Sequence, residues 1–453
     1  MDIELPSRVR KIISTLEDQG YEAFAVGGCV RDVCLGKKPS DWDITTSAPP
    51  LKVKEMFSHT VDTGLKHGTV TVVMGQENFE VTTYRIDGAY EDMRHPKEVT
   101  FTTSLSEDLK RRDFTINAMA YNERQGIIDL FGGREDLEHH LIRCVGEPEE
   151  RFHEDALRIF RAVRFSAQLD FSIDGDTAEA IRKLAPELGQ ISPERIRTEL
   201  EKLITSDHPE RLRTAWKLGV TAQILPEFDA IMTQVQNNAH HVYTVGEHTL
   251  RTMQNIPPES ILRFTMLFHD FGKPAVETVD EEGIYHYKNH ARASEKIAVS
   301  IMKRLKFDNA SMNTIRRLIA IHSLYPEETE EGVRRAVHKM GEDLFPAYLK
   351  VKRADILGQS PAVQSAKLAY LGRVEDLYAT ILKRRDCMSL KEMKVTGDDL
   401  KKAGISAGPG MGRILNTLLD DVLSVPEHNE RGYLMHRAEE LAGSALYKAA
   451  GES

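Results

Sequence analysis

The sequence predicts an α+β protein, with a small mixed or antiparallel sheet in residues 1–140 and helices in the rest of the chain. Alternating β-branched and polar residues, as in GTVTVVMG (68–75), are typical of strands. From about residue 150 the apolar residues take helical spacing, as in EDALRIFRAVRFSAQL (154–169). A chain of 453 residues with two such patterns is long enough for several domains.

The first elements follow from local patterns. Residues 7–19 carry one apolar helical face, and EAFAVGG (22–28) predicts a strand that ends in glycines. NFEVTTYRI (78–86) follows GTVTVVMG after only two residues, so the two segments predict a hairpin. FTINAMAYN (114–122) and GIIDLFGG (126–133) predict a further strand and a turn.

The later part of the chain predicts helices joined by short polar loops, with no internal repeat. SPERIRTELEKLI (192–204) shows a clear helix start, with Ser192 at the N-cap position and Pro193 at the first helical position. The acidic segment YPEETEEGVRR (325–335) predicts a solvated loop that opens another helix.

Composition limits the classes of function. Hydrophobic residues make up 41% and charged residues 29% of the chain, and no apolar run is long enough to cross a bilayer, so we expect no membrane partner. The N-terminus has no signal-peptide core, which predicts a cytoplasmic protein. The net charge of −10 argues against a generally basic surface for nucleic acid but allows a local basic groove. The cysteines lack C-x-x-C spacing and are expected to be inert thiols: Cys29, Cys34, Cys144 and Cys387.

A D-x-D pair in SDWDITTSA (40–48) is the first candidate for chemistry. On a strand, Asp41 and Asp43 would point to the same side, and two adjacent carboxylates favour a divalent cation such as Mg²⁺. Gly27 and Gly28 would let the backbone approach a phosphate, and Arg31 would supply a cation. The combination predicts nucleotidyl transfer, although a D-x-D alone is common on protein surfaces.

Four charged residues at intervals of three predict a site that reads a nucleotide base. On one helix, Asp155 and Arg164 would be separated by a rise of ~13 Å, about the reach from a base edge to a γ-phosphate. Asp155 accepts and Arg158 donates hydrogen bonds, which suits cytosine and adenine and mismatches uracil and guanine. The alternative is an ordinary amphipathic helix with solvated arginines and a core face of Leu157, Phe160 and Val163.

These motifs, with YRIDGAYEDMRHPKEVTF and RRDFTINAMAYN between them, resemble the class II tRNA nucleotidyltransferases and bacterial poly(A) polymerases of the polymerase-β-like superfamily. The resemblance covers about the first 230 residues. It implies a polymerase-β-like nucleotidyltransferase head in which Asp41 and Asp43 are the catalytic Mg²⁺ ligands. It further implies that the E-D-x-x-R motif serves as an amino-acid template for CTP and ATP. The nucleotide-binding residues that it implies are Gly28, Arg31, Arg112, Asp155, Arg158, Arg161 and Arg164, with Glu154 completing the motif.

Two further segments of this resemblance concern specificity and support. YRIDGAYEDMRHPKEV (84–99) resembles the flexible loop of CCA-adding and A-adding members, which argues against an enzyme that adds only C residues. Asp113 and Asn117 have the chemistry either to fix the ribose or carboxylates or to brace the site, and both readings stay open.

A second set of candidate residues combines imidazoles and carboxylates: His248, His269, Asp270, His290, His322 and Asp355. Such ligands suit Mn²⁺, Ni²⁺ or Fe²⁺. A single histidine is more often a structural residue, and a chain with 17 histidines gives chance matches. The order H…HD…H…H…D resembles the six-ligand, two-metal variant of the HD phosphohydrolases. HD domains in some tRNA nucleotidyltransferases are associated with phosphatase and 2′,3′-cyclic phosphodiesterase activities, so a second activity is a hypothesis here.

The segment 395–423 resembles the tail of the nucleotidyltransferase family, which contacts the tRNA elbow. Gly408, Gly410 and Gly412 lead into a predicted helix, whose first N–H groups could bind an RNA phosphate, and a plain turn is the alternative.

The sequence thus predicts an all-α neck, HD body and tail after the head, with boundaries 1–140, 141–230, 231–385 and 386–453. The expected function is template-independent addition of the tRNA 3′-terminal CCA, with Mg²⁺ as cofactor, tRNA, CTP and ATP as partners, and no DNA. The alternatives are an A-adding enzyme, a poly(A) polymerase, which is disfavoured by the lack of a strongly basic C-terminal extension, and an HD phosphohydrolase acting on RNA ends.

Overall fold

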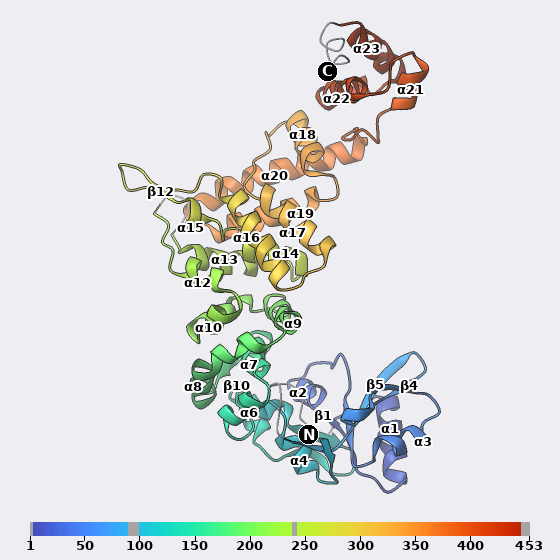
Figure 1. Ribbon diagram of the computed structural model, residues 1–453, viewed down its shortest axis with the longest axis vertical. Coiled ribbons are helices and arrows are strands. Elements are labelled where there is room, and N and C mark those ends of the chain that lie inside the picture. Colours follow the sequence, from blue (N-terminus) through green and yellow to red (C-terminus); the bar gives the residue numbers. More distant parts are fainter. Residues whose placement is uncertain (1–2, 89–98, 238–241, 445–453) are drawn as a thin grey trace. The chain divides into compact units, whose positions relative to one another are not determined.

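The computed structural model describes residues 3–88, 99–237 and 242–444 (Figure 1). The chain divides into two compact units, the first formed by residues 1–230 with 303–306 and the second by residues 231–302 with 307–453. Most of the predicted loop at 84–99 lies outside the described residues. The predicted α+β class is confirmed, because a mixed sheet precedes a long helical part.

A seven-stranded mixed sheet forms the centre of the first unit (Figure 1). All neighbouring strands are antiparallel except β2 and β5, which run parallel. The predicted hairpin is confirmed, with Thr69 opposite Thr82 and Met74 opposite Glu77. In spatial order the strands are β3 (Thr60–Gly64), β4 (Thr69–Met74), β5 (Glu77–Thr83), β2 (Ile44–Thr46), β1 (Ala23–Val26), β8 (Met119–Asn122) and β9 (Gly126–Asp129).

Short helices and ribbons surround this sheet. The first helix buries Val9, Ile12, Ile13 and Leu16, the face that the sequence predicts, and packs against β1. This helix is α1 (Ser7–Asp18). The other elements around the sheet are α2 (Gly28–Cys34), α3 (Pro50–Met56), α4 (Leu105–Lys110), α5 (Gly133–Glu138) and the ribbon of β6 (Arg85–Asp87) and β7 (Val99–Phe101).

Two predicted strands are shorter than expected. β2 begins only at Ile44, so Asp41 and Asp43 lie in the extended segment that leads into it. The Asp43 carbonyl still accepts a hydrogen bond from Val26 N at 3.0 Å, which aligns this segment with β1. In FTINAMAYN, residues Thr115–Asn117 form a 3₁₀ turn, because the Asp113 side chain accepts hydrogen bonds from Phe114 N and Asn117 Nδ2.

The predicted single helix through Asp155 and Arg164 is wrong. α6 (Pro148–Glu154) ends before Asp155, and α7 (Leu157–Leu169) begins after it. Asp155 is extended (φ −148°, ψ 101°), and its Oδ1 accepts a hydrogen bond from Leu157 N at 3.1 Å. An aspartate in this position starts a helix rather than continuing one, so a ~13 Å helical rise from Asp155 to Arg164 does not apply.

The rest of the first unit is helical. Ser192 and Pro193 occupy the predicted N-cap and first helical positions of α9, although the Ser192 side chain makes no capping hydrogen bond. The helices are α8 (Gly175–Leu184), α9 (Pro193–Ile204), α10 (Leu212–Lys217), α11 (Thr221–Ile224) and α12 (Pro226–Met232), and β10 (Leu141–Ile142) pairs with β11 (Ser172–Ile173).

The second unit is built from helices and one small hairpin of β12 (Thr278–Val279) and β13 (Tyr285–His286). The last three helices pack around a core of their own that includes Leu400, Ile414 and Leu434. The division into four domains at the three predicted boundaries stays a prediction. The helices are α13 (Val245–Gln254), α14 (Ser260–Phe268), α15 (Lys273–Val276), α16 (His290–Arg304), α17 (Asn309–Ile321), α18 (Glu330–Met340), α19 (Phe345–Gly358), α20 (Pro361–Arg384), α21 (Gly397–Lys402), α22 (Pro409–Ser424) and α23 (Arg431–Gly443).

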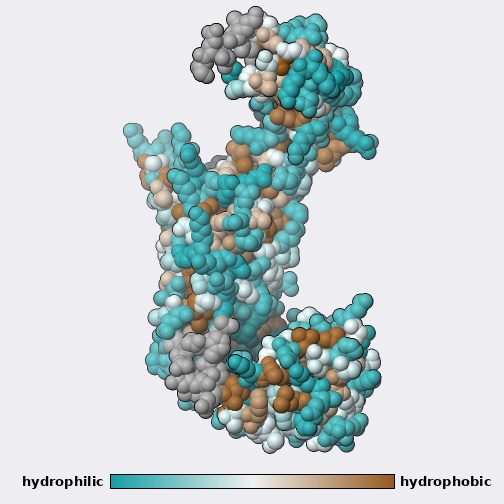
Figure 2. All heavy atoms as spheres, turned by 45° about the vertical axis from the view of Figure 1, so that its right-hand side comes forward, coloured by the Kyte–Doolittle hydropathy of each residue, from teal (hydrophilic) through white to brown (hydrophobic). Residues whose placement is uncertain are grey.

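Figure 2 shows hydrophilic residues over most of the face that it displays, with apolar residues in small scattered groups. Among the described residues, no helix is both long and apolar enough to cross a membrane. All four cysteines are free thiols, and burial raises the pKa of Cys29 to about 12.

Candidate functional site

A glycine turn at the end of strand β1 lies beside a cationic side chain. Gly27 follows β1 with φ +82°, a conformation that favours glycine, and Gly28 begins α2. A Cβ atom at Gly27 would lie 3.0 Å from Arg112 Nη1, so the missing side chain leaves room for this guanidinium. The backbone of Gly27 and the guanidinium of Arg112 therefore lie side by side, and the guanidinium can donate hydrogen bonds to phosphate oxygens.

The paired carboxylates line a cavity of about 560 Å³ beside β4 and β5. Asp43 is exposed to solvent, yet desolvation by the surrounding residues raises the pKa of Asp43 to about 6. The negative charges of Asp41 and Glu80 also raise this pKa. Arg112 opposes this shift. Three carboxylates around one cavity repel one another, and a hard divalent cation relieves such repulsion, so these residues fit Mg²⁺. The remaining lining residues are Trp42, Val61, Thr63, Thr71 and Asn78.

A fully buried carboxylate holds Arg112 and its neighbour in place. Asp108 Oδ1 lies 2.7 Å from Arg111 Nη2, and Asp108 Oδ2 lies 3.7 Å from Arg112 Nη2. Thr45, in the strand after the D-x-D, donates a further hydrogen bond to Asp108 at 3.0 Å. Burial alone would raise the pKa of Asp108, but the Arg111 and Arg112 charges hold it below its usual range. Asp108 thus connects the carboxylate segment to the arginine that faces the glycine turn.

Asp113 and Asn117 connect helix α7 to the sheet. Arg161 on α7 donates to Asp113 Oδ2 from Nε at 2.8 Å and from Nη2 at 2.6 Å. Asn117 donates to Asp113 Oδ1 and accepts a hydrogen bond from Arg31 Nη1 at 2.7 Å. Asp32 Oδ1 accepts from the other side of the Arg31 guanidinium. This network favours the bracing role for Asp113 and Asn117.

Asp155 and Arg158 lie next to each other but have separate partners. Arg158 Nη1 pairs with Glu154 Oε2 at 2.5 Å, and its Nη2 donates to the Arg111 carbonyl at 2.9 Å. Asp155 Oδ2 instead pairs with Arg195 Nη2 of α9 at 2.7 Å. Both polar side chains are therefore anchored by neighbouring elements, and both stay partly exposed. An anchored acceptor beside an anchored donor is a geometry that can select a base edge.

The helix that carries these arginines is not merely amphipathic. Leu157, Phe160 and Val163 are buried, so the core face of the alternative interpretation is right. Arg164, however, is only 6% exposed, and its Nε lies 2.6 Å from Glu199 Oε2. Burial lowers the pKa of Arg164 to about 10. The alternative interpretation is therefore wrong in treating Arg164 as solvated. A contact between Arg164 and a phosphate stays a prediction.

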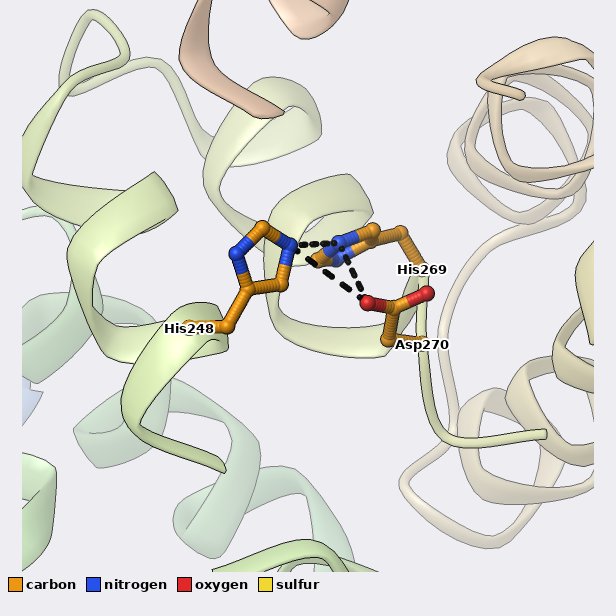
Figure 3. Close-up of side chains that lie close together, drawn as sticks. All are labelled: His248, His269 and Asp270. Atoms are coloured by element: carbon orange, nitrogen blue, oxygen red, sulfur yellow. Dashed lines mark hydrogen bonds and ion pairs between the residues drawn. The ribbon is translucent and has the colours of Figure 1, made fainter. Parts of the chain in front are cut away.

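The six residues predicted for a second metal site converge in the second unit, and we call them the His–Asp cluster. His248 lies on α13, His269 and Asp270 follow α14, and Figure 3 shows these three side chains pointing toward one another. His290 begins α16, His322 follows α17, and Asp355 lies on α19. Helix ends and helix faces from five elements thus bring together the six predicted ligands, His248, His269, Asp270, His290, His322 and Asp355.

The Asp270 carboxylate lies between two pairs of histidines. Its Oδ2 is 3.4 Å from His248 Nε2 and 3.2 Å from His269 Nε2. Its Oδ1 is 3.6 Å from His290 Nε2 and 3.9 Å from His322 Nε2. Asp355 Oδ1 approaches the first pair, at 3.1 Å from His248 Nε2. The two carboxylate oxygens of Asp270 thus face separate pairs of histidines, an arrangement that would suit two adjacent cations.

Hydrogen bonds at the far side of the rings fix which nitrogen can bind a metal. The Nδ1 atoms of His269, His290 and His322 lie 2.6–2.8 Å from backbone carbonyl oxygens, so these Nδ1 atoms carry the protons. The Nε2 lone pairs of His290 and His322 then face each other at 3.2 Å. Such an approach repels unless a cation lies between the rings, so the cluster fits divalent metal ions.

Gly408 and Gly410, two of the three tail glycines, border a groove of about 880 Å³. Gly408, with φ +151°, caps α22, and a Cβ atom at Gly408, Gly410 or Gly412 would meet no atom within 4 Å. Phosphate binding at this helix start stays a prediction.

Comparisons with known proteins cover nearly the whole chain. Residues 23–143 match the family described as "Poly A polymerase head domain", and residues 288–438 match "tRNA nucleotidyltransferase domain 2". The CCA-adding enzyme of Pediococcus pentosaceus is 34% identical over 433 residues, which is 95% of this chain and 97% of that protein. The chain belongs to the CCA-adding enzymes. A third match, to "RNA and SrmB- binding site of polymerase A", covers residues 170–232.

Other relatives agree with this assignment. The CCA-adding enzyme of Lactiplantibacillus plantarum is 36% identical over 441 residues, 96% of each chain. The crystal structure of the Bacillus stearothermophilus CCA-adding enzyme in complex with CTP superposes with a TM-score of 0.71 at 30% identity, covering 97% of this chain and 99% of that one. The predicted family, fold class and nucleotidyltransferase activity are confirmed. Membership also implies dependence on a divalent metal ion, generally Mg²⁺.

Sequence reasoning missed three residues that position this CCA-adding enzyme's candidate site. Glu80 belongs to the predicted strand 78–86, where alternation places its side chain on the other face of the sheet from Phe79 and Val81. Asp108 lies three and four residues before Arg111 and Arg112, a helical spacing that indicates such pairs. Arg195 carries no such signal, because its partner Asp155 comes from another element.

Proposed function

We propose that this CCA-adding enzyme completes the 3′-terminal CCA of tRNA from CTP and ATP, without a nucleic-acid template, at the pocket of Asp41 and Asp43. The observation that carries the proposal is a pair of carboxylates in one cavity. The Gly27 turn and the Arg112 guanidinium lie next to each other, and the Arg112 charge acts on Asp43. The proposal is supported by relatives named CCA-adding enzymes, one of which was crystallised with CTP.

Each residue of this pocket has a role in binding or orientation. Asp41 and Asp43 would hold Mg²⁺, which when bound neutralises phosphate charge and favours ionisation of the tRNA 3′-hydroxyl. Arg112 and Arg31 bind oxygens of the triphosphate, and Gly28 leaves the backbone accessible to it. Asp108 and Asn117 hold these two arginines in place. The 3′-hydroxyl then meets an α-phosphate whose position is already fixed.

Asp155 and Arg158 select the base. Cytosine and adenine both present an amino group next to an unprotonated ring nitrogen, so the Asp155 carboxylate accepts from the former and Arg158 donates to the latter. Uracil and guanine present a carbonyl next to an N–H and would leave both side chains without partners. Arg161 and Arg164 would contribute positive charge toward the phosphates from the next turns of α7.

Alanine substitutions test the assignment of the carboxylates. Asp41→Ala and Asp43→Ala should each abolish the transfer of both C and A to a tRNA with an incomplete 3′ end. The matched control is Asp62→Ala, because Asp62 is exposed and pairs with Lys54 at 2.9 Å. Full transfer by either pocket variant would refute the proposed metal ligands.

The same assay separates the two related alternatives. An A-adding enzyme would extend only a tRNA that already ends in CC, and a poly(A) polymerase would add many A residues. The relatives named CCA-adding enzymes favour completion of all three nucleotides.

A second activity is supported by the His–Asp cluster, which we propose to be a divalent-metal phosphohydrolase site. Its ligands suit Mn²⁺, Ni²⁺ or Fe²⁺, and two cation positions bridged by Asp270 suit hydrolysis of a phosphate ester. Metal analysis of the purified protein, with phosphate release from a 2′,3′-cyclic nucleotide, tests this proposal. No bound metal and no turnover with any of these ions would refute it.

A further inference from the structure

On one side, Asp43 lies beside the glycine turn of the first unit. Its carbonyl oxygen accepts a hydrogen bond from Val26 N at 3.0 Å, and Gly27 follows Val26 directly. Arg112, whose guanidinium lies next to Gly27, interacts electrostatically with the Asp43 carboxylate. The groups proposed for the triphosphate, the Gly27 backbone and Arg112, therefore lie toward β1 from Asp43.

On its other side, Asp43 begins a row of side chains that crosses three further strands. β2 pairs in parallel with β5, and this register makes Glu80 the neighbour of Asp43. Glu80 is directly opposite Thr71 on β4, and Thr71 is directly opposite Val61 on β3. Directly opposite residues share one face of a sheet. All four residues line the cavity of about 560 Å³, which therefore extends from Asp43 toward the β3 edge, away from the glycine turn.

The geometry of phosphoryl chemistry assigns different groups to these two sides. The attacking oxygen and the leaving oxygen lie roughly in line, on opposite sides of the phosphorus atom. In the proposed function the triphosphate lies against Gly27 and Arg112, so the pyrophosphate leaves toward β1. The 3′-hydroxyl of the tRNA then approaches Asp43 from the β5 side, where the cavity lies.

The charges of the cavity agree with this division. Among the described residues that line it, three are carboxylates, Asp41, Asp43 and Glu80, and none is cationic. Such walls repel a triphosphate and suit an uncharged sugar and base. A volume of about 560 Å³ lies within the usual range for small-molecule sites, so the cavity has room for one nucleoside.

The remaining walls offer the contacts that bind a nucleoside. Trp42 is half-buried and contributes an aromatic surface on which a base can stack, and Val61, 52% exposed, adds an apolar surface. Asn78 is exposed and lies two residues before Glu80, on the same face of β5. Its amide both donates and accepts hydrogen bonds, as does the 2′-hydroxyl that distinguishes RNA from DNA.

We propose that this cavity binds the last nucleoside of the tRNA acceptor end, with Trp42 stacked on the base and the Asn78 amide hydrogen-bonded to the ribose 2′-hydroxyl. This inference rests on the proposed function and adds two residues that recognise an RNA end. Trp42 and Asn78 bind the acceptor, and the bond-forming step stays with the groups already assigned to it.

Tryptophan fluorescence of the full-length protein tests where the acceptor end binds, because the chain has only two tryptophans. Trp216→Phe leaves Trp42 as the one emitter. In the presence of Mg²⁺, a tRNA that ends in CC should quench this emission, since the terminal base stacks on the indole ring. CTP alone should leave the emission nearly unchanged, because it binds toward β1. No quenching by the tRNA, or equal quenching by CTP, would refute the place of the acceptor.

Asn78→Ala tests the contact with the 2′-hydroxyl. The acceptors are two CC-ending tRNAs whose last residue is cytidine or 2′-deoxycytidine, each extended with ATP. The wild type should prefer the ribose end by about three- to tenfold in kcat/KM, the effect of one hydrogen bond, and Asn78→Ala should use both ends equally. Gln76→Ala is the matched control, since Gln76 is exposed in the turn of the same hairpin and outside the cavity lining. A preference that survives in Asn78→Ala would overturn this contact.

Trp42→Ala should raise the KM for tRNA by about 5- to 50-fold, because stacking on one base is lost. The KM for ATP should stay within about twofold of the wild-type value. Trp42→Phe keeps an aromatic ring and should recover most of the affinity for tRNA. A lower kcat with an unchanged KM for tRNA would show that Trp42 only supports its neighbours Asp41 and Asp43, and would contradict the proposal.

The outcomes separate this inference from the proposed function. If Asp41→Ala and Asp43→Ala abolish transfer but Trp42→Ala and Asn78→Ala use every acceptor as the wild type does, the acceptor cavity is refuted and the proposed function stands. If the two aspartate variants keep full transfer, the proposed metal ligands and this inference both fall.

Discussion

Asp155 pairs with Arg195 rather than with Arg158, through an Oδ2–Nη2 distance of 2.7 Å. The proposed base-reading carboxylate is therefore oriented by helix α9, while Arg158 is oriented by Glu154 at 2.5 Å. Because both anchors lie outside α7, the proposed selectivity for C and A would depend on residues of neighbouring elements.

Arg195→Ala should relax base choice without removing a nucleotide contact. The Asp155 carboxylate would lose a charged hydrogen bond, so discrimination against UTP and GTP should fall by about 10- to 100-fold. The measurement is the ratio of kcat/KM values for correct and incorrect nucleotides in single-addition reactions. Arg182→Ala, which removes an exposed Arg182–Glu179 pair, is the control. Unchanged discrimination in Arg195→Ala would show that Asp155 needs no such anchor.

Gly27→Ala should weaken triphosphate binding. The new methyl group would lie 3.0 Å from Arg112 Nη1, and the φ of +82° would add backbone strain of about 1–3 kcal/mol. We expect higher KM values for both CTP and ATP. Gly36→Ala is a matched control, because Gly36 has φ +70° but open space around its Cβ position. Equal KM values in the two variants would mean that strain alone, and not Arg112, explains the effect.

Much of this site could be predicted from the sequence because its motifs are local. Asp41 and Asp43 are separated by one residue, and Gly27, Gly28 and Arg31 lie within one turn, so short-range geometry already brings them together. The six residues of the His–Asp cluster were also predicted as a set, because their order along the chain resembles a known pattern, and the structure brings them together. Their binding of metal stays a prediction.

The pairings between distant elements could not be predicted. The break at Asp155 arises from a side-chain hydrogen bond to Leu157 N, which competes with the helical spacing that the sequence shows. Arg195 meets Asp155 only through the packing of α9, and hydrophobic periodicity does not indicate which charged groups then meet.

Asp113→Asn should reduce stability in a pH-dependent way. Burial alone would raise the pKa of Asp113, but Arg161 and Asn117 hold it below the usual value of 3.8. The ionised carboxylate therefore stabilises the folded state fully above about pH 4, and this contribution is lost as the pH falls toward the lowered pKa. The difference in melting temperature between the wild type and Asp113→Asn should be largest at pH 7 and shrink below pH 4. A difference that does not depend on pH would contradict this account.

Asp270→Ala should reduce metal binding at both positions of the His–Asp cluster, because each carboxylate oxygen faces one pair of histidines. After loading with Mn²⁺ and gel filtration, we expect two ions per wild-type chain in this cluster and at most one in the variant. The control is Asp280→Ala, which removes an exposed partner of His286 in the same unit. Two retained ions in Asp270→Ala would rule out a bridging carboxylate.

The central claim is tested most directly by incubating the wild-type protein with Mg²⁺ and a tRNA that lacks its last three nucleotides. The products with CTP, with ATP and with both are then sized at single-nucleotide resolution. The account predicts two added residues with CTP alone and three with CTP plus ATP, with no further extension. Failure to add C, or an open-ended run of A residues, would contradict it.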